Sequence, residues 1–211
     1  MDEAFRQPEG SARRLSWDEA PGAILASAHA LRRDDRPVLV GVSGPVGSGK
    51  STLARRLGGV VVSTDDYLPD YEGLPEHERD LPERADLDRL SDNLDALRSG
   101  RPTTAPEWSF NTHRRVGERR VEPAPIVVCE GIHALHGRIA ELHDLRVFVE
   151  SPRDVRWARW KAIEEASERG WGVERARAFF ERVAEPTFQA RSETYRATAH
   201  VIVINDQHND E

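Results

Sequence analysis

The sequence predicts an α/β fold in which helices cover both faces of a parallel β-sheet. Short apolar runs without polar alternation recur along the chain, which is typical of strands buried on both faces. Longer stretches with helical spacing separate these runs, and this alternation indicates a parallel sheet. A length of 211 residues is enough for one such domain with a well-buried core.

The predicted elements follow in chain order. Residues 1–14 are expected to be frayed, and a helix is expected over residues 16–33, where Ser16 and Glu19 have capping-box spacing and Pro21 places the start nearby. Five strands are then expected, at residues 37–42, 60–63, 126–129, 145–149 and 201–204. Further helices are expected at residues 50–57, 86–98, 152–169 and 173–198. Residues 70–84 and 100–125 are interpreted as irregular insertions, which are often functional.

Composition narrows the class of protein. The net charge of −7 argues against a nucleic-acid partner, because phosphate binding requires a basic surface. Cys129 is the only cysteine, so an internal disulfide is excluded, as fits a reducing compartment. We find neither an apolar run of membrane-spanning length nor a signal-peptide core, and the histidines lack metal-ligand spacing. We therefore expect a cytoplasmic protein without a membrane partner or a structural metal.

A phosphate-binding motif lies between the first predicted strand and the second predicted helix. Residues 44–51 read G-P-V-G-S-G-K-S, which matches G-x-x-x-x-G-K-[ST]. Glycines allow backbone N–H groups to converge on phosphate oxygens, and the following helix points its positive end at the same anion. We therefore expect an ATP site formed by Gly44, Val46, Gly47, Ser48, Gly49, Lys50, Ser51 and Thr52. Lys50 would bind the β- and γ-phosphates, and the Ser51 hydroxyl suits Mg²⁺.

Acidic residues follow two of the predicted strands, at the edge where ligands bind in open parallel sheets. Asp65 follows residues 60–63, beside the expected γ-phosphate, where it could accept a proton from an acceptor hydroxyl or hold Mg²⁺ through water. A helix cap or a turn explains an aspartate there equally well. Glu130 ends the strand at 126–129 and could orient water on Mg²⁺.

A basic stretch lies on the helix predicted at residues 152–169. Arg153, Arg156 and Arg159 are three residues apart and therefore project on one side of it. A mobile basic lid can place cations on a migrating phosphoryl group, although a solvated face paired with glutamates is the strong alternative. The tryptophans of this region, at 157, 160 and 171, are expected to pack rather than to bind a ligand. No Asn-Lys-x-Asp base-recognition motif is present, which excludes a GTPase.

The order of these motifs resembles the uridine kinase/phosphoribulokinase family of P-loop kinases. The resemblance covers residues 37–205, and its more specific parts are Phe-x-x-His-x-Arg at 110–115 and Glu-Pro-Thr at 185–187. It implies a nucleoside-monophosphate-kinase-like α/β/α sandwich with a five-stranded parallel sheet and a lid at 153–170. It also implies a kinase that uses ATP and Mg²⁺ to phosphorylate a hydroxyl of a small acceptor, and family members also form dimers or tetramers.

The resemblance assigns roles to individual residues. Asp65 would be the general base, with Lys50 and Arg159 as further catalytic groups and Arg156 at the nucleotide. Ser51, Asp65 and Glu130 would serve Mg²⁺. The acceptor pocket would include Asp65, Tyr67, Arg79, Asp80, Trp108, His113 and Arg115.

Three interpretations of function remain open. A nucleoside resembling uridine or cytidine is the first choice of acceptor, with a sugar phosphate or another small alcohol as the alternative. Glu164 and Glu165 stand where the family has an Arg-Asp pair, and Trp108-Ser109-Phe110 replaces Tyr-Asp-Phe. A nucleotide-binding regulatory protein with little transfer activity is therefore the third interpretation.

Overall fold

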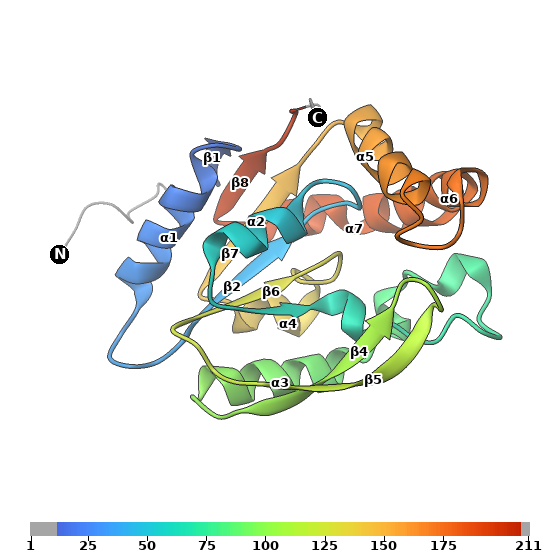
Figure 1. The fold of residues 1–211 in the computed structure, drawn as a ribbon. Helices are drawn as coiled ribbons and strands as arrows, with labels where there is room; N and C mark the ends of the chain where they lie inside the picture. The colour runs from blue at the N-terminus through green and yellow to red at the C-terminus, as the bar shows by residue number, and fades with distance from the viewer. Residues whose placement is uncertain (1–11, 208–211) are drawn as a thin grey trace.

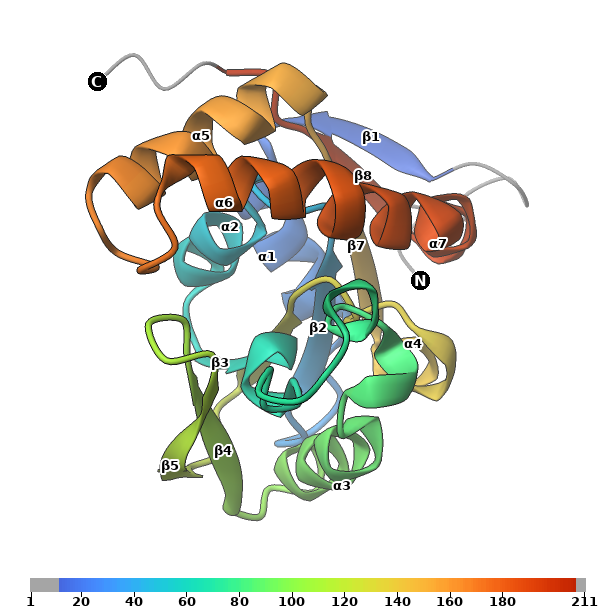
Figure 2. The ribbon, with the colours of Figure 1, turned by 90° about the vertical axis from the view of Figure 1, so that its right-hand side faces the viewer.

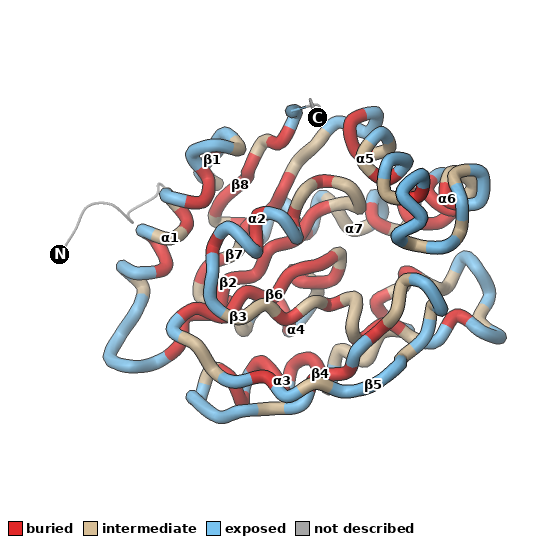
Figure 3. The backbone as a smooth tube through the Cα atoms, in the orientation of Figure 1, coloured by how far each residue is buried: buried red, intermediate tan, exposed pale blue. Residues whose placement is uncertain are grey.

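In a computed structural model that describes residues 12–207, a six-stranded parallel sheet forms the centre of the molecule (Figure 1). Its strand order is β1-β8-β7-β2-β6-β3, and every neighbouring pair is parallel. The strands are β1 (Arg13–Ser16), β2 (Val38–Ser43), β3 (Val60–Ser63), β6 (Ile126–Glu130), β7 (Leu145–Glu150) and β8 (Val201–Ile204). The central strands β2 and β6 are buried along their whole length, as their apolar runs predict (Figure 3).

The prediction of five strands is wrong because residues 13–16 form an additional edge strand. β1 pairs in parallel with β8, and of its four side chains only Leu15 is buried. A strand with one buried side chain lacks an apolar pattern, so the sequence showed no strand there. The expected fraying of residues 12–14 is likewise wrong, whereas residues 1–11 lie outside the described part of the chain.

The helices cover both faces of the sheet. They are α1 (Ala20–Leu31), α2 (Lys50–Leu57), α3 (Leu87–Arg98), α4 (Gly137–Leu142), α5 (Arg153–Glu165), α6 (Val173–Phe179) and α7 (Glu185–Thr198). α1 and α2 pack on one face, and α3, α4 and α7 pack on the other. The first helix begins at Ala20 rather than at residue 16; Ser16 and Glu19 form their reciprocal contact in the turn before it.

The two insertions differ in structure. Residues 70–84 contain only short 3₁₀ turns, at Glu76–Glu78 and Pro82–Arg84, in agreement with the prediction. Residues 100–125, also predicted to be irregular, contain the antiparallel hairpin β4 (Thr103–Ser109) and β5 (Arg114–Val121) (Figure 2). β5 exposes most of its charged side chains, so it lacks the apolar signal of the central strands.

The long helix predicted at residues 173–198 is interrupted by a π-helical segment, Phe180–Ala184. Pro186 lies two residues after this segment and has no backbone N–H to donate to the preceding turn, which explains why the regular hydrogen-bond pattern changes here. α5, α6 and this segment stand over the carboxyl ends of the strands (Figure 2). Within residues 12–207, no helix is long and apolar enough to cross a membrane.

Candidate active site

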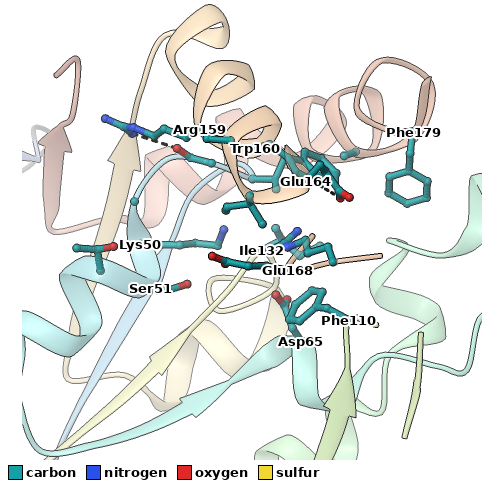
Figure 4. A pocket seen from close by; sticks show the side chains of 18 of the residues that line it. Lys50, Ser51, Asp65, Phe110, Ile132, Arg159, Trp160, Glu164, Glu168 and Phe179 are labelled. Carbon is teal, nitrogen blue, oxygen red and sulfur yellow. Dashed lines mark hydrogen bonds between the residues drawn. The ribbon is translucent and has the colours of Figure 1, made fainter. Parts of the chain in front are cut away.

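A cleft of 1440 Å³ lies between the phosphate loop, the β4–β5 hairpin and α5 (Figure 4). Of the predicted site residues, the cleft is lined by Val46, Gly47, Gly49, Lys50, Ser51, Thr52, Asp65, Trp108, His113 and Arg159, and also by Asp80. The other predicted residues do not line it; these are Gly44, Ser48, Tyr67, Arg79, Arg115, Glu130 and Arg156. The topology thus brings together residues far apart in sequence.

The phosphate loop has the backbone that its glycines predict. Gly47 and Gly49 adopt φ angles of 75° and 94°, which residues with a Cβ rarely adopt. A Cβ on Gly47 would stand 2.5 Å from the Arg156 carbonyl oxygen, so this position also has no room for one. Lys50 is buried beside the loop, and burial lowers the pKa of its ammonium group, an effect that Glu130 and Asp65 oppose.

Glu130 is buried beneath the phosphate loop between two hydroxyl groups. It accepts hydrogen bonds from Ser51 Oγ at 3.0 Å and from Ser63 Oγ at 3.1 Å. Burial and the nearby Asp65 raise the pKa of Glu130, while Lys50 opposes that shift. These hard oxygen donors suit Mg²⁺, which binds through one or two protein ligands and substrate phosphates. Residues 12–207 contain no cluster of three or more His, Cys, Asp or Glu side chains that could hold a metal alone.

The two aspartates after β3 lie in different surroundings. Asp65 lines the cleft, and its backbone N–H donates to Ser63 Oγ at 3.2 Å, at the start of a 3₁₀ turn over Thr64–Tyr67. Asp66 instead accepts from the backbone N–H of Trp108 and from Arg119, both at 3.4 Å. Asp65 is therefore available to a ligand, whereas Asp66 holds the hairpin against the sheet.

Aromatic side chains enclose the end of the cleft beyond Asp65. The His113 ring is stacked on Trp171, with ring centres 4.4 Å apart, and on Tyr71 at 5.6 Å. Trp108 meets the edge of Tyr71 at 5.0 Å. Burial, with nearby arginines, lowers the pKa of His113 to about 4, so this imidazole is neutral at pH 7. The hairpin, residues 70–84 and α6 each contribute to this aromatic end, which Phe110 and Phe179 complete.

Three of the predicted acceptor residues support this pocket from behind. Tyr67 is fully buried, and its hydroxyl accepts from Asn93 at 2.7 Å. Arg79 lies over the Tyr71 ring, 5.0 Å from its centre. Arg115 pairs with Asp86 at 3.5 Å. Their assignment to the acceptor stays a prediction, because none of the three lines the cleft.

Asp80 is a buried carboxyl group at the aromatic end of the cleft. It accepts a hydrogen bond from the Tyr71 hydroxyl at 3.2 Å. Burial and the charge of Asp65 raise the pKa of Asp80 to about 7 from its ordinary value of 3.8. Folding therefore favours the protonated form, and the protein should lose stability as the pH rises from about 4 to about 7.

Replacing Asp80 with asparagine should remove this dependence on pH. Above pH 7 the variant should be more stable than the wild type by roughly 2–4 kcal/mol, because the penalty for burying the charge disappears. Denaturant unfolding at pH 5 and pH 8 measures the difference. Asp92→Asn, on the exposed side of α3, is the matched control and should retain the wild-type dependence. If the stability of Asp80→Asn still fell between pH 5 and pH 8 as much as that of the wild type, Asp80 would not be the source of the pH dependence.

The arginines predicted to form a basic lid are bound by protein groups. Arg156 is buried and forms a two-point ion pair with Glu185, in which Nη2 lies 2.8 Å from Oε2. Arg159, in the middle of α5, donates to the Gly47 carbonyl at 3.1 Å and to Asn205 Oδ1 at 2.9 Å (Figure 4). Both arginines link the helix to the phosphate loop, and their roles toward the nucleotide stay predictions.

The turn after α5 carries another cation into the cleft. Arg169 lies over the Phe110 ring, 4.3 Å from its centre, and lines the cleft. Glu164 holds this turn: it accepts from Trp160 Nε1 at 3.1 Å, from Trp171 N at 3.3 Å and from Gly172 N at 3.1 Å. Glu164 therefore fixes the turn between α5 and α6, in the region predicted to form a lid. Trp160 and Trp171, both expected to pack, also line the cleft, whereas Trp157 does not.

Comparison with known proteins agrees with this geometry. Residues 73–210 match the Phosphoribulokinase / Uridine kinase family. A uridine kinase of Clostridium perfringens is 31% identical over 188 residues, which cover 82% of this chain and 90% of the relative. The chain belongs to this family. A uridine kinase of Deinococcus deserti is 37% identical over 149 residues, covering 64% of this chain and 72% of the relative.

Solved structures show the same fold. A candidate fructose transport system kinase from Silicibacter sp. superposes with a TM-score of 0.71 at 22% identity, covering 87% of this chain and 98% of that chain. A possible uridine kinase from Bacillus stearothermophilus superposes with a TM-score of 0.57 at 20% identity, covering 88% of this chain and 98% of that chain. The predicted family and α/β kinase fold are confirmed, and this family member is a phosphotransferase with an alcohol group as acceptor.

Proposed function

We propose that the protein transfers the γ-phosphate of ATP to a hydroxyl group of a nucleoside. One observation carries the proposal: Asp65 faces the same cleft as Lys50 and Ser51, and aromatic side chains enclose the cleft beyond it. The phosphate loop suits the donor, the carboxylate suits a hydroxyl, and the aromatic end suits a planar base. The names of the curated relatives support a nucleoside over a sugar phosphate.

The donor phosphates bind at the amino end of α2. Backbone N–H groups of residues 46–51 surround the β-phosphate, and the Lys50 ammonium group neutralises charge between the β- and γ-phosphates. Ser51 and Glu130 would hold Mg²⁺, which would offset the charge on the phosphate oxygens. The mutual contact of these two side chains supports this assignment.

The acceptor hydroxyl lies between Asp65 and the γ-phosphate. Asp65 accepts the hydroxyl proton as the new P–O bond forms, and it retains this proton while ADP leaves. Arg169, on the cleft side of the lid turn, supplies positive charge to the migrating group. The aromatic residues of the hairpin and the lid exclude water, so that ATP is not hydrolysed in place of transfer.

A coupled ADP-release assay tests the proposal. Mg-ATP is supplied with one acceptor at a time from a panel of uridine, cytidine, purine nucleosides, pentose phosphates, pantothenate and glycerate. We expect nucleosides to stimulate ADP release above the acceptor-free rate. Stimulation only by a pentose phosphate would replace the nucleoside with a sugar phosphate. No stimulation by any member, with tight Mg-ATP binding, would overturn the kinase and favour a nucleotide-binding regulator.

A further inference from the structure

The edge strand β1 places a tryptophan at the end of the cleft that the proposed reaction leaves unassigned. β1 pairs with β8 in a register that sets Ser16 opposite Ile204, so Trp17 and Asn205 leave the sheet side by side. Trp17 is half-buried and packs on the core formed with α1 and α2. It lines the cleft together with Gly49, Thr52, Arg55, Asn205 and Gln207. All of these residues lie at the phosphate-loop end, away from the aromatic acceptor end.

The indole of Trp17 lies directly against the start of α2. A Cβ built on Gly49 would stand 3.0 Å from Trp17 Cη2, and the Arg56 guanidinium lies 5.5 Å from the centre of the indole. Because the phosphates bind at this helix start, the rest of the donor nucleotide can extend to the indole. The ring is thus next to the phosphates without belonging to the phosphate loop.

The wall around Trp17 is held rigid by hydrogen bonds between distant parts of the chain. Asn205 is buried, and its Nδ2 donates to the Ser48 carbonyl at 2.8 Å while its Oδ1 accepts from Arg159. Gln207 Nε2 donates to Asp18 Oδ2 at 3.4 Å, which ties the segment after β8 to the residue that follows Trp17. A fixed aromatic surface of this kind binds planar groups at low entropic cost.

The orientation of the donor follows from the two ends of the cleft. Asp65 and the aromatic acceptor end fix the direction of the γ-phosphate. The nucleoside part of the donor must therefore extend from the phosphate loop in the opposite direction, toward Trp17 and Gln207. Stacking accepts any base, since every base has a π-face.

We propose that Trp17 is a nucleotide-binding residue that packs against the base of the donor nucleotide, so that β1 completes the base site. This inference rests on the proposed function, because it assumes that ATP binds as the donor at the phosphate loop. Residues 73–210, which match the family model, include neither Trp17 nor the phosphate loop. Trp17 should contribute similarly to the affinity for ATP and for GTP, since the indole contacts the face of the base rather than its edge.

Binding of Mg-ATP and of Mg-tripolyphosphate, both measured by calorimetry, tests the proposal without an acceptor or turnover. Trp17→Ala and Trp17→Leu should each raise the Kd for ATP about tenfold or more, whereas tripolyphosphate, which has no base, should bind with unchanged affinity. The leucine variant retains apolar packing on the core, and retained tripolyphosphate binding shows that the phosphate loop is folded. Trp17→Phe should stay close to the wild type.

Trp157 provides a matched control, because it is also half-buried but packs on Phe180 in the lid, 5.5 Å between ring centres. Trp157→Ala should leave both affinities unchanged. Unchanged ATP binding in Trp17→Ala, or an equal loss for ATP and tripolyphosphate, would overturn the inference while the proposed kinase stands. A wild-type protein that binds tripolyphosphate but not ATP would overturn both.

Discussion

Replacing Asp65 with asparagine should lower kcat by about 10²–10⁴-fold, while the Kd for Mg-ATP changes only a few-fold. The asparagine keeps the size of the side chain but cannot take the acceptor proton. Since Lys50 and the backbone of the phosphate loop hold the donor, binding should persist. Steady-state kinetics with the best acceptor of the panel and calorimetry with Mg-ATP give the two quantities.

The neighbouring aspartate provides the control. Asp66→Asn has the same chemistry one position along the chain, but Asp66 accepts from Trp108 N and Arg119 and does not line the cleft. This variant should affect stability and the acceptor KM more than kcat. Equal losses of kcat in both variants, or a greater loss in Asp66→Asn, would rule out Asp65 as the base.

The phosphate loop and the acids at the strand ends were predictable because they depend on topology alone. In a parallel sheet the carboxyl ends of the strands meet at one edge. Asp65 and Glu130 therefore had to approach the loop that follows β2, whatever the details of packing. Ser51 and Glu130, which are 79 residues apart, accordingly form a hydrogen bond of 3.0 Å.

The lid and the acceptor end were less predictable, because they depend on which side of a helix packs and on how loops fold. Arg156 and Arg159 lie on the side of α5 that was expected to face the cleft. In the structure, Glu185 binds the Arg156 guanidinium group, and the phosphate loop binds that of Arg159. Arg169 reaches the cleft from the turn after α5 instead. Tyr71 lies in an insertion without periodicity, so no pattern indicated its contact with His113.

The edge strand shows a related limit. A strand on the outside of a sheet needs few apolar side chains, and β1 buries only Leu15. Its charged neighbours therefore resembled a frayed terminus. The remaining signal in the sequence is Trp17, directly after β1. A large apolar side chain is unfavourable in a fully exposed segment, and in the structure Trp17 is half-buried.

Glu164 distinguishes an active kinase from a regulator, and its replacement should have the second large effect. If Glu164 repelled the donor phosphates, Glu164→Ala would raise activity. The structure predicts the opposite, because the carboxylate accepts from Trp160, Trp171 and Gly172, and its loss leaves these donors without a partner. The lid turn that carries Arg169 should then loosen.

Glu164→Ala should therefore lower kcat/KM roughly 10- to 100-fold, since small displacements of positioning groups have effects of this size. Its signature should be a higher ratio of ATP hydrolysed to acceptor phosphorylated, because a loose lid admits water. Glu164→Gln, which retains an acceptor oxygen, should recover part of the loss. Glu165→Ala is the control, since Glu165 is exposed and pairs with Lys161 at 3.2 Å. Comparable losses at both glutamates, or a gain at Glu164, would show that the lid depends on charge rather than on these hydrogen bonds.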